Sequence, residues 1–246
     1  MFSYAARPDL LQGKTILVTG ASSGLGRAAA LSYASHGATV LLLGRNLEKL
    51  EAVYDAIESA GGPQPALMKL DFETAGEAEC QEVANIVANE FGKLDGLLHS
   101  AALSAATLPL QFVTLSSWNK LMQVNLTAAF ALTRACIPVL QQAPHASVIF
   151  TSSRAGRETR AYWGPYAISK HGVETLMEIF HHELATTSRI RVNSLNPGPC
   201  ATALRKVIFP AEDPATAVQP ETLMPLYLYL MGDDSLHENG GRFDAQ

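Results

Sequence analysis

The sequence predicts an α/β domain in which a parallel sheet carries helices on both of its faces. Short runs of aliphatic and β-branched residues alternate with helical segments along all 246 residues, which is the pattern of parallel sheets. The first of these runs leads through a glycine-rich turn directly into a helix. No linker, repeat or low-complexity segment interrupts the alternation, so we expect one domain over residues 1–246.

The glycine-rich turn is Thr19-Gly20-Ala21-Ser22-Ser23-Gly24-Leu25-Gly26. A strand over residues 14–18 precedes it, and a helix ending near residues 36–37 follows it. Glycines let the backbone approach a ligand closely, and a helix N-terminus directs unpaired N–H groups at it, so the turn suits phosphate groups. The spacing is GxxxGxG rather than the more common GxGxxG. A tight turn that binds nothing is the alternative.

The second strand, over residues 38–43, ends at Gly44-Arg45-Asn46, with Asn46 as the candidate N-cap of a helix over residues 47–60. NAD-binding units of this kind place an acidic residue at the strand end, where it holds the ribose hydroxyls. Here Gly44 and Arg45 stand in its place, and a guanidinium can pair with a 2′-phosphate through two hydrogen bonds. We therefore expect NADP(H) to be preferred over NAD(H), the alternative being a solvated surface arginine.

The remaining elements continue the alternation. Strands are expected over residues 66–70, ending at Asp71, and over 94–99, 146–151, 190–195 and 241–244. Helices are expected from a capping box at residues 74–77 to about Phe91, and over 116–142, 164–187 and 221–231. Residues 196–219 hold four prolines and little periodicity, which predicts a mobile substrate loop at about 197–220.

Composition and charge exclude several classes of partner. A net charge of −5 gives no general attraction to nucleic acid or to an anionic membrane. The three cysteines form no CxxC pair, and His181-His182 has no third ligand in view, so we expect no metal and a reducing compartment. Residues 1–12 lack a signal core, and polar residues interrupt the uncharged stretch 96–119. A cytoplasmic protein that acts on a small molecule follows.

Three side chains could carry acid–base chemistry. Tyr166 and Lys170 lie four residues apart on one expected helix face, and Ser153 follows the strand over residues 146–151. An ammonium group beside a phenol lowers the pKa of the phenol, and a serine hydroxyl can hold a carbonyl or alcohol oxygen next to it. Beside a nicotinamide, this trio would move a proton while the cofactor moves a hydride.

Together these residues resemble the short-chain dehydrogenase/reductase family, from Gly13 to about Ala245. The motifs that carry the resemblance are the glycine turn, Asn125, Ser153, Tyr166-x-x-x-Lys170 and Asn196-Pro197-Gly198-x-x-x-Thr202. The resemblance implies a single Rossmann-type domain with seven parallel strands. It also implies that Tyr166 is the acid/base and that Lys170 lowers its pKa and holds the nicotinamide ribose. Ser153 would orient the substrate oxygen, and Asn125 would support a water in a proton relay.

The same resemblance implies that Asp71 lies near the adenine and that Pro197, Gly198 and Thr202 contact the nicotinamide and the phosphates. The expected cofactor-binding set is Gly20, Ser22, Ser23, Gly24, Leu25, Gly26, Arg45, Asp71, Ser100, Ala101, Tyr166, Lys170, Pro197, Gly198 and Thr202. One departure is His99-Ser100-Ala101-Ala102 where the family usually has Asn-Asn-Ala-Gly, which we expect to weaken cofactor binding. Residues 9–11, 43–46, 231–234 and 243–246 are most similar to the YciK-type bacterial oxidoreductases, a branch that implies no substrate.

Two surface features have more than one interpretation. Arg154, Arg157 and Arg160 either meet an acidic substrate or pair with Glu158 or a neighbouring subunit. The two long helices carry more apolar residues than one face needs, which predicts a homodimer or homotetramer. These residues are Ala128, Ala129, Phe130, Leu132 and Ala135 in the first helix and Leu176, Met177, Ile179 and Phe180 in the second.

The function that the sequence predicts is an NADP(H)-dependent oxidoreductase that interconverts a carbonyl and a secondary alcohol. A cofactor-binding regulatory or scaffold protein with little turnover is the alternative, and the altered residues 99–102 keep it open. A sugar-nucleotide epimerase would use the same Tyr/Lys pair, but the chain is short for the extra substrate domain, and GxxxGxG is the wrong spacing.

Overall fold

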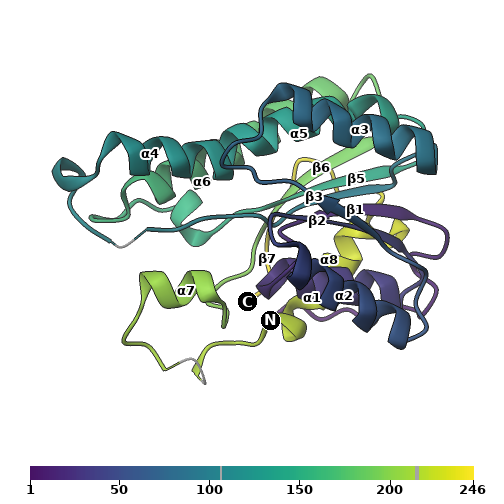
Figure 1. The fold of residues 1–246 in the computed structure, drawn as a ribbon, viewed down its shortest axis with the longest axis horizontal. Coiled ribbons are helices and arrows are strands. Elements are labelled where there is room, and N and C mark those ends of the chain that lie inside the picture. Colours follow the sequence, from purple (N-terminus) through teal and green to yellow (C-terminus); the bar gives the residue numbers. More distant parts are fainter. Residues whose placement is uncertain (106, 214–215) are drawn as a thin grey trace.

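The computed structural model describes residues 1–105, 107–213 and 216–246. Its centre is a seven-stranded parallel sheet in the order β3-β2-β1-β4-β5-β6-β7 (Figure 1). The strands are β1 (Thr15–Thr19), β2 (Thr39–Gly44), β3 (Ala66–Lys69), β4 (Gly96–His99), β5 (Ala146–Thr151), β6 (Ile190–Asn196) and β7 (Arg242–Asp244). The expected single Rossmann-type domain with seven parallel strands is therefore confirmed.

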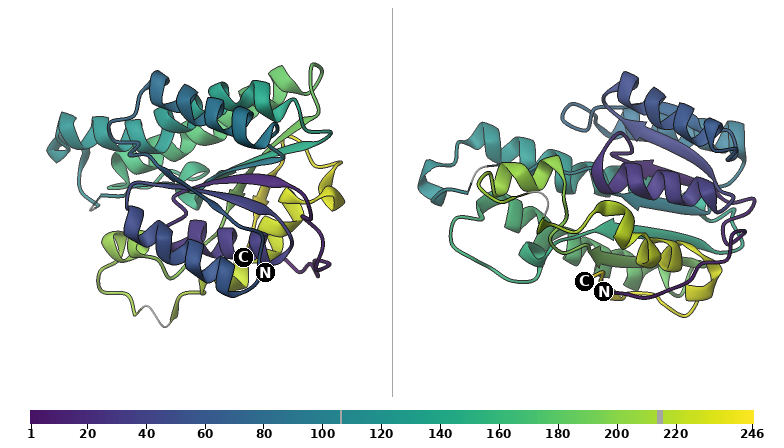
Figure 2. Two further views of the ribbon diagram at one scale, coloured as in Figure 1. Left: turned by 45° about the vertical axis from the view of Figure 1, so that its right-hand side comes forward. Right: turned by 90° about the horizontal axis from the view of Figure 1, so that it is seen from below.

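Helices cover both faces of the sheet, as Figures 1 and 2 show. One layer contains α3 (Glu77–Phe91), α4 (Leu115–Met122), α5 (Ala128–Leu140) and α6 (Gly164–Leu184), and the other contains α1 (Gly24–Ser35), α2 (Leu47–Ser59) and α8 (Met224–Met231). Side chains alternate across β1: Leu17 belongs to the core under the first layer, and Ile16 and Val18 to the core under the second. Strands buried on both faces explain the continuous apolar runs in the sequence.

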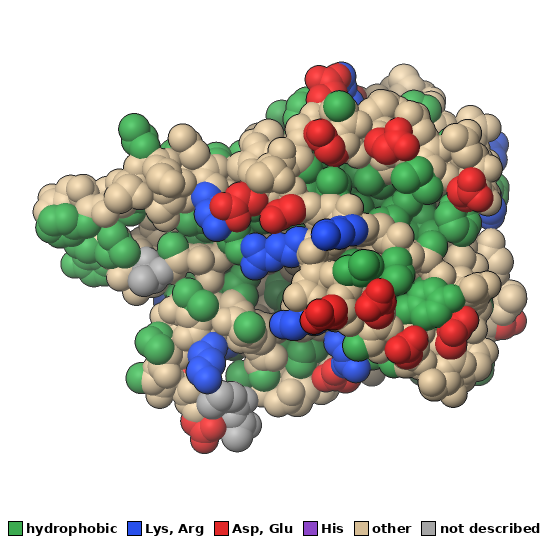
Figure 3. Space-filling view, viewed as in Figure 1, with side chains coloured by type: hydrophobic (Ala, Val, Ile, Leu, Met, Phe, Trp, Pro, Cys, Tyr) green, Lys and Arg blue, Asp and Glu red, His purple; other side chains and the backbone are tan. Residues whose placement is uncertain are grey.

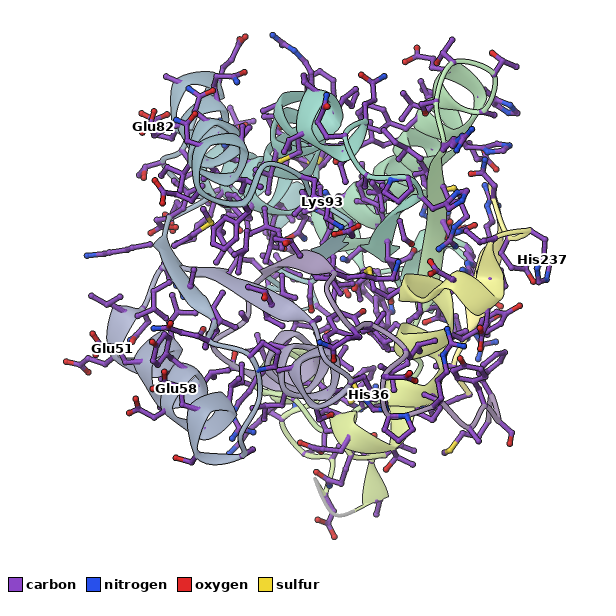
Figure 4. The ribbon with its side chains drawn as sticks, turned by 90° about the vertical axis from the view of Figure 1, so that its right-hand side faces the viewer. His36, Glu51, Glu58, Glu82, Lys93 and His237 are labelled. Carbon is purple, nitrogen blue, oxygen red and sulfur yellow. The ribbon has the colours of Figure 1, made fainter. Side chains whose placement is uncertain are left out.

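The order of the strands reverses next to β1, which pairs with β2 on one side and with β4 on the other. At such a switch point the loops that follow the two strands diverge, and a crevice opens at their carboxyl ends. Figure 4 looks at the opposite end of the sheet, where Lys93 precedes β4 and the labelled Glu51, Glu58 and Glu82 point away from the core. There Asp95 accepts hydrogen bonds from the Thr15 backbone N–H (2.9 Å) and from Lys93 (2.9 Å).

Two local expectations are wrong in detail. Helix α3 begins at Glu77, and its N-cap is Gly76 rather than Thr74, because the Glu79 carboxylate accepts a hydrogen bond from the Gly76 N–H at 2.8 Å. The expected helix over 116–142 is not a continuous α-helix, since a π-helical turn at Gln123–Thr127 joins α4 to α5. This turn surrounds Asn125, and such turns commonly mark functional sites.

The segment expected to be a mobile substrate loop contains the short helix α7 (Ala203–Ile208). Cys200 and Val218 form a parallel bridge at the base of this excursion. Part of the expected segment, residues 214–215, lies outside the described residues. The motion of the segment stays a prediction.

Most of the apolar surplus expected on the two long helices is buried within this one chain. Leu132, Met177 and Phe180 belong to the core, and the large apolar side chains of the set that remain exposed are Phe130 and Ile179, at 42% and 48%. By length and composition alone, one stretch of the described residues, Leu115–Leu140, could cross a membrane, and half of its apolar 18-residue window is buried inside the fold. The core helix of a globular protein has the same property.

Candidate active site

A cavity of about 490 Å³ opens at the carboxyl ends of the central strands. Its wall includes every expected site residue except Gly26 and Asn125, namely Gly20, Ser22, Ser23, Gly24, Leu25, Arg45, Asp71, Ser100, Ala101, Ser153, Tyr166, Lys170, Pro197, Gly198 and Thr202. Figure 3 shows the molecule hollowed between the lobe that carries α7 and the arm that carries α4. The fold thus brings segments from six different loops to one hollow.

The glycine turn has a backbone that side chains would block. Gly20 has a positive φ of 66°, and a Cβ atom there would lie 2.9 Å from the Ala101 backbone. A Cβ on Gly26 would lie 2.3 Å from the carbonyl oxygen of Gly20, so α1 packs directly against the end of β1. Gly26 therefore shapes the cavity from behind rather than lining it. The open cradle at the N-terminus of α1 fits a dinucleotide phosphate group.

Thr19, the first residue of the glycine turn and not one of the expected site residues, fastens this turn to the loop after β4. Its hydroxyl oxygen accepts hydrogen bonds from the backbone N–H groups of Ser100 (3.0 Å) and Ala101 (3.1 Å). A threonine at the end of the first strand is the feature of the sequence from which this role could have been predicted.

At the far end of the cavity, Arg45 extends from the end of β2. Its side chain is exposed and makes no ion pair or hydrogen bond with any residue that the structure describes. Ser23 is the N-cap residue of α1, yet its hydroxyl makes no capping hydrogen bond. Asp71 lines the same end and accepts a hydrogen bond from the Glu73 N–H at 3.0 Å. An uncommitted guanidinium and hydroxyl fit the 2′-phosphate of NADP(H).

Tyr166 lines the cavity and lies on the first turn of α6. Burial raises the pKa of Tyr166, and its hydrogen bond with Ser153 lowers it by a smaller amount. In the protein alone the pKa of Tyr166 therefore lies above its ordinary value, because desolvation of the phenolate outweighs the other contributions, and the expected lowering by Lys170 stays a prediction. The phenol is accordingly protonated at neutral pH.

Lys170 lies one helical turn after Tyr166 and is 4% exposed. Its ammonium donates a hydrogen bond to the carbonyl oxygen of Thr151 at 2.7 Å and lies 6.0 Å from the centre of the Tyr166 ring. Burial lowers the pKa of Lys170 to about 8, and the negative charge of Glu174 raises it in part. Lys170 is thus fixed to the end of β5 while it faces the cavity.

Asn125 lies behind the cavity, and its side-chain amide is already engaged. Its Oδ1 atom accepts a hydrogen bond from the Leu103 N–H (2.7 Å), and its Nδ2 atom donates to the Leu103 carbonyl (2.9 Å) and to the Ser169 hydroxyl (3.0 Å). The amide therefore holds the loop after β4 against α6. A role of Asn125 in a water relay stays a prediction.

His99, which replaces the usual asparagine, points into the core rather than toward the cavity. Its ring stacks on Phe150 at 4.7 Å and its Nε2 atom lies 2.8 Å from the Thr133 hydroxyl. Burial and the nearby Lys170 charge lower the pKa of His99 to about 3, which keeps the ring neutral. The hydroxyl of Thr19 holds the loop backbone at this point, while Ala102 lines the cavity.

The loop after β6 forms another part of the wall. Gln246 donates hydrogen bonds from one amide nitrogen to the carbonyl oxygens of Pro197 (2.7 Å) and Pro199 (2.9 Å). Gly198, between them, has a positive φ of 71°. Thr202 caps α7 by accepting a hydrogen bond from the Arg205 N–H at 3.2 Å.

The three arginines after Ser153 do not line the cavity. Arg154 and Arg160 both pair with Glu158 at the surface, which agrees with the expected alternative in which these arginines pair with Glu158. Arg157 instead bridges the buried Glu174 and the exposed Asp244, at 2.9 Å to each. The expectation that one of them meets an acidic substrate is therefore not supported by their positions.

A family profile described as short chain dehydrogenase matches residues 14–213. The chain belongs to the short-chain dehydrogenase family. It is 46% identical over 243 residues to the uncharacterized oxidoreductase YciK of Escherichia coli (strain K12), covering 99% of this chain and 96% of that protein. The expected similarity to the YciK-type branch is confirmed, and the chain is an oxidoreductase.

Two solved structures of similar proteins contain the expected cofactor. A short-chain dehydrogenase from Shigella flexneri 2a, complexed with NADP, superposes with a TM-score of 0.95 at 45% identity, covering 98% of this chain and 100% of that chain. One from Escherichia coli CFT073, complexed with NADPH, gives a TM-score of 0.95 at 46% identity, with the same coverage. Relatives of this short-chain dehydrogenase therefore bind NADP(H).

Several residues around the site belong to no family motif and were not predicted from the sequence. Trp163 lies three residues before Tyr166, a spacing that places both on one side of the helix start. Ser169 and Thr151 act on the motif residues through hydrogen bonds. Leu204 and Phe209 reach the cavity from α7 and the residue after it, for which the sequence offered no periodic signal.

The lowered pKa of Lys170 predicts a pH-dependent stability. Between the folded pKa of about 8 and the ordinary value of 10.5, the unfolded chain binds the lysine proton while the folded protein has released it. The free energy of unfolding of the wild type, relative to Lys170→Met, should therefore rise with pH across this window, by about 3 kcal/mol in total. Urea unfolding at several pH values from 7 to 10.5 measures this difference, and parallel curves for the two proteins would contradict it.

Proposed function

We propose that this short-chain dehydrogenase is an NADP(H)-dependent oxidoreductase that interconverts a ketone or aldehyde with the corresponding alcohol. The observation that carries the proposal is the convergence of Ser153, Tyr166 and Lys170 on the cavity that begins at the glycine turn and Arg45. The cofactor, when bound, supplies or accepts the hydride at the carbonyl carbon. The side chains of the protein provide the proton and hold the oxygen.

In the direction of reduction, the Tyr166 phenol donates its proton to the substrate oxygen as the carbonyl carbon gains the hydride. The carbonyl is thereby reduced, and one proton and one hydride are consumed for each alcohol formed. Ser153 lies within hydrogen-bonding reach of the phenol and holds the same oxygen. The buried Lys170 ammonium stabilises the phenolate that remains, because charges interact strongly in a dry site.

We assign the cofactor contacts to the glycine turn and the surrounding loops. Gly20, Ser22, Ser23, Gly24 and Leu25 would receive the phosphates, with Gly26 allowing α1 its close approach. Asp71, Ser100, Ala101, Pro197, Gly198 and Thr202 would line the adenine and nicotinamide positions. The unpaired Arg45 supports a preference for NADP(H) over NAD(H).

Removing the phenol hydroxyl tests the proton donor. Tyr166→Phe should lower kcat by about 10² or more, the contribution of general acid–base catalysis, while NADPH affinity changes little. Steady-state assays over a panel of ketones, quinones and 3-oxoacyl thioesters provide the measurement. Tyr162→Phe is the matched control, because this exposed tyrosine does not line the cavity. A near-normal kcat for Tyr166→Phe would refute the assignment.

Replacing the guanidinium tests the cofactor preference. Arg45→Ala should weaken NADPH binding by about 1.5–3 kcal/mol, the range for hydrogen bonds to charged groups, and leave NADH binding nearly unchanged. Fluorescence titration with both cofactors measures this, with the exposed Lys49→Ala on α2 as the control for loss of a positive charge. If the wild type already prefers NADH, the role proposed for Arg45 is refuted.

We also propose that two chains, or two pairs of chains, associate through α5 and α6. Phe130 and Ile179 are exposed large apolar residues on these helices, and association would cover them. Light scattering after size exclusion should give a mass at least twice the 26.3 kDa of one chain. The Ile179→Ser substitution should lower this mass. Ile86→Ser on α3 is the control, and a fully active wild-type monomer would contradict the proposal.

We further propose a cytoplasmic location. All three cysteines are free and buried, which supports a reducing compartment. Cell fractionation distinguishes this location from an exported one.

A further inference from the structure

Part of the cavity wall next to Tyr166 is apolar. The residues of this wall are Leu103, Trp163, Leu204, Val207, Ile208 and Phe209. Four of them, Leu103, Trp163, Leu204 and Ile208, pack in one cluster with the catalytic Tyr166. In Figure 3 hydrophobic side chains gather on the α7 lobe and on the arm that faces it across the hollow.

Two aromatic rings extend this wall outward from the phenol. Trp163 lies 6.3 Å from the ring of Tyr166, and Phe209 lies 6.0 Å from Trp163 in an edge-to-face arrangement at 62°. Rings at these distances and angles attract one another and present apolar surface to a ligand. The wall therefore runs from the proton donor to the end of α7.

The cation that lines the cavity next to this wall, Arg205, is already paired. Arg205 lines the cavity, but its guanidinium donates two hydrogen bonds to the Glu212 carboxylate and lies 4.7 Å from the centre of the Phe209 ring. The hydroxyl of Ser104 donates to the Leu204 carbonyl at 3.3 Å. Within the described part of the wall, no cation remains unpaired for a substrate carboxylate. Burying such a carboxylate without a partner would be strongly unfavourable.

We propose that the substrate of this site is an uncharged carbonyl compound, or its secondary alcohol, that carries an apolar ring. The ring lies along Trp163 and Phe209 while the oxygen meets Ser153 and Tyr166. This inference rests on the proposed oxidoreductase function and adds the substrate class. Small polyols and keto acids are poor substrates, because the wall offers them neither hydrogen-bond partners nor a free charge.

Matched substrates test the inference. An aryl alkyl ketone and its para-carboxylate derivative have the same reacting group and nearly the same shape, and a four-carbon ketone provides a reference that is too short to reach Phe209. With NADPH, kcat/KM should be at least a hundredfold higher for the uncharged aryl ketone than for the carboxylate. The ratio of kcat/KM for the aryl ketone to that for the short ketone should fall about tenfold in both Trp163→Ala and Phe209→Ala, equivalent to one lost ring contact. Trp163→Phe should recover most of the loss.

Lys206→Ala is the matched control on α7, because Lys206 is exposed and does not line the cavity. Equal or faster turnover of the carboxylate would overturn the inference and leave the oxidoreductase proposal intact. An unchanged substrate ratio in both aromatic variants would also overturn it. A protein that binds NADPH but reduces no carbonyl compound with any of these groups contradicts the proposed function itself.

Discussion

The arrangement of the site depends on one buried charge, the ammonium of Lys170, and on its hydrogen bond to the Thr151 carbonyl. An ammonium that has lost its water must be held by protein groups, and this bond ties α6 to the carboxyl end of β5. Because Tyr166 lies one turn earlier on the same helix, the same bond sets how far the phenol reaches into the cavity. Ser153 follows the strand to which Lys170 is tied, so Tyr166 and Ser153 share one support.

A polar network along α6 strengthens this support. Ser169 receives a hydrogen bond from Asn125 and donates one to the Tyr166 carbonyl at 2.8 Å. One turn beyond Lys170, Glu174 accepts hydrogen bonds from Ser194 (2.6 Å) and Arg157 (2.9 Å). Buried polar groups that are paired in this way specify one arrangement of helix and sheet. They explain why residues outside the catalytic motifs matter for the geometry of the site.

The sheet, its parallel strands and the cavity could be predicted from the sequence, because each depends on local patterns. Buried strands read as apolar runs, and the motif residues at the ends of β1, β2 and β5 necessarily meet at one edge of a parallel sheet. The N-cap of α3 and the π turn around Asn125 escaped prediction, since each depends on a choice between alternative hydrogen bonds separated by a small free energy.

The pKa of Tyr166, the ion pairs of Arg157 and the apolar wall could not be predicted either, and for a different reason. Burial determines the pKa of Tyr166, and burial results from the packing of Trp163 and Leu103 around it. The partners of Arg157, Glu174 and Asp244, are distant in the sequence, so neither interpretation of this arginine from the sequence includes them. The environment of α7 likewise arises from long-range contacts, such as the bridge between Cys200 and Val218, and leaves no periodic trace.

The most direct test of the account follows the hydrogen that NADPH transfers to the substrate. The wild-type protein is incubated in ordinary water with an uncharged aryl ketone and NADPH that carries deuterium on one face of the nicotinamide C4 atom. A second, separate reaction uses the isotopomer with deuterium on the opposite face. The account predicts an alcohol whose carbinol carbon carries deuterium from only one of the two isotopomers. Proton NMR of the product reads the carbinol position. An alcohol without deuterium at the carbinol carbon from either isotopomer would contradict the account.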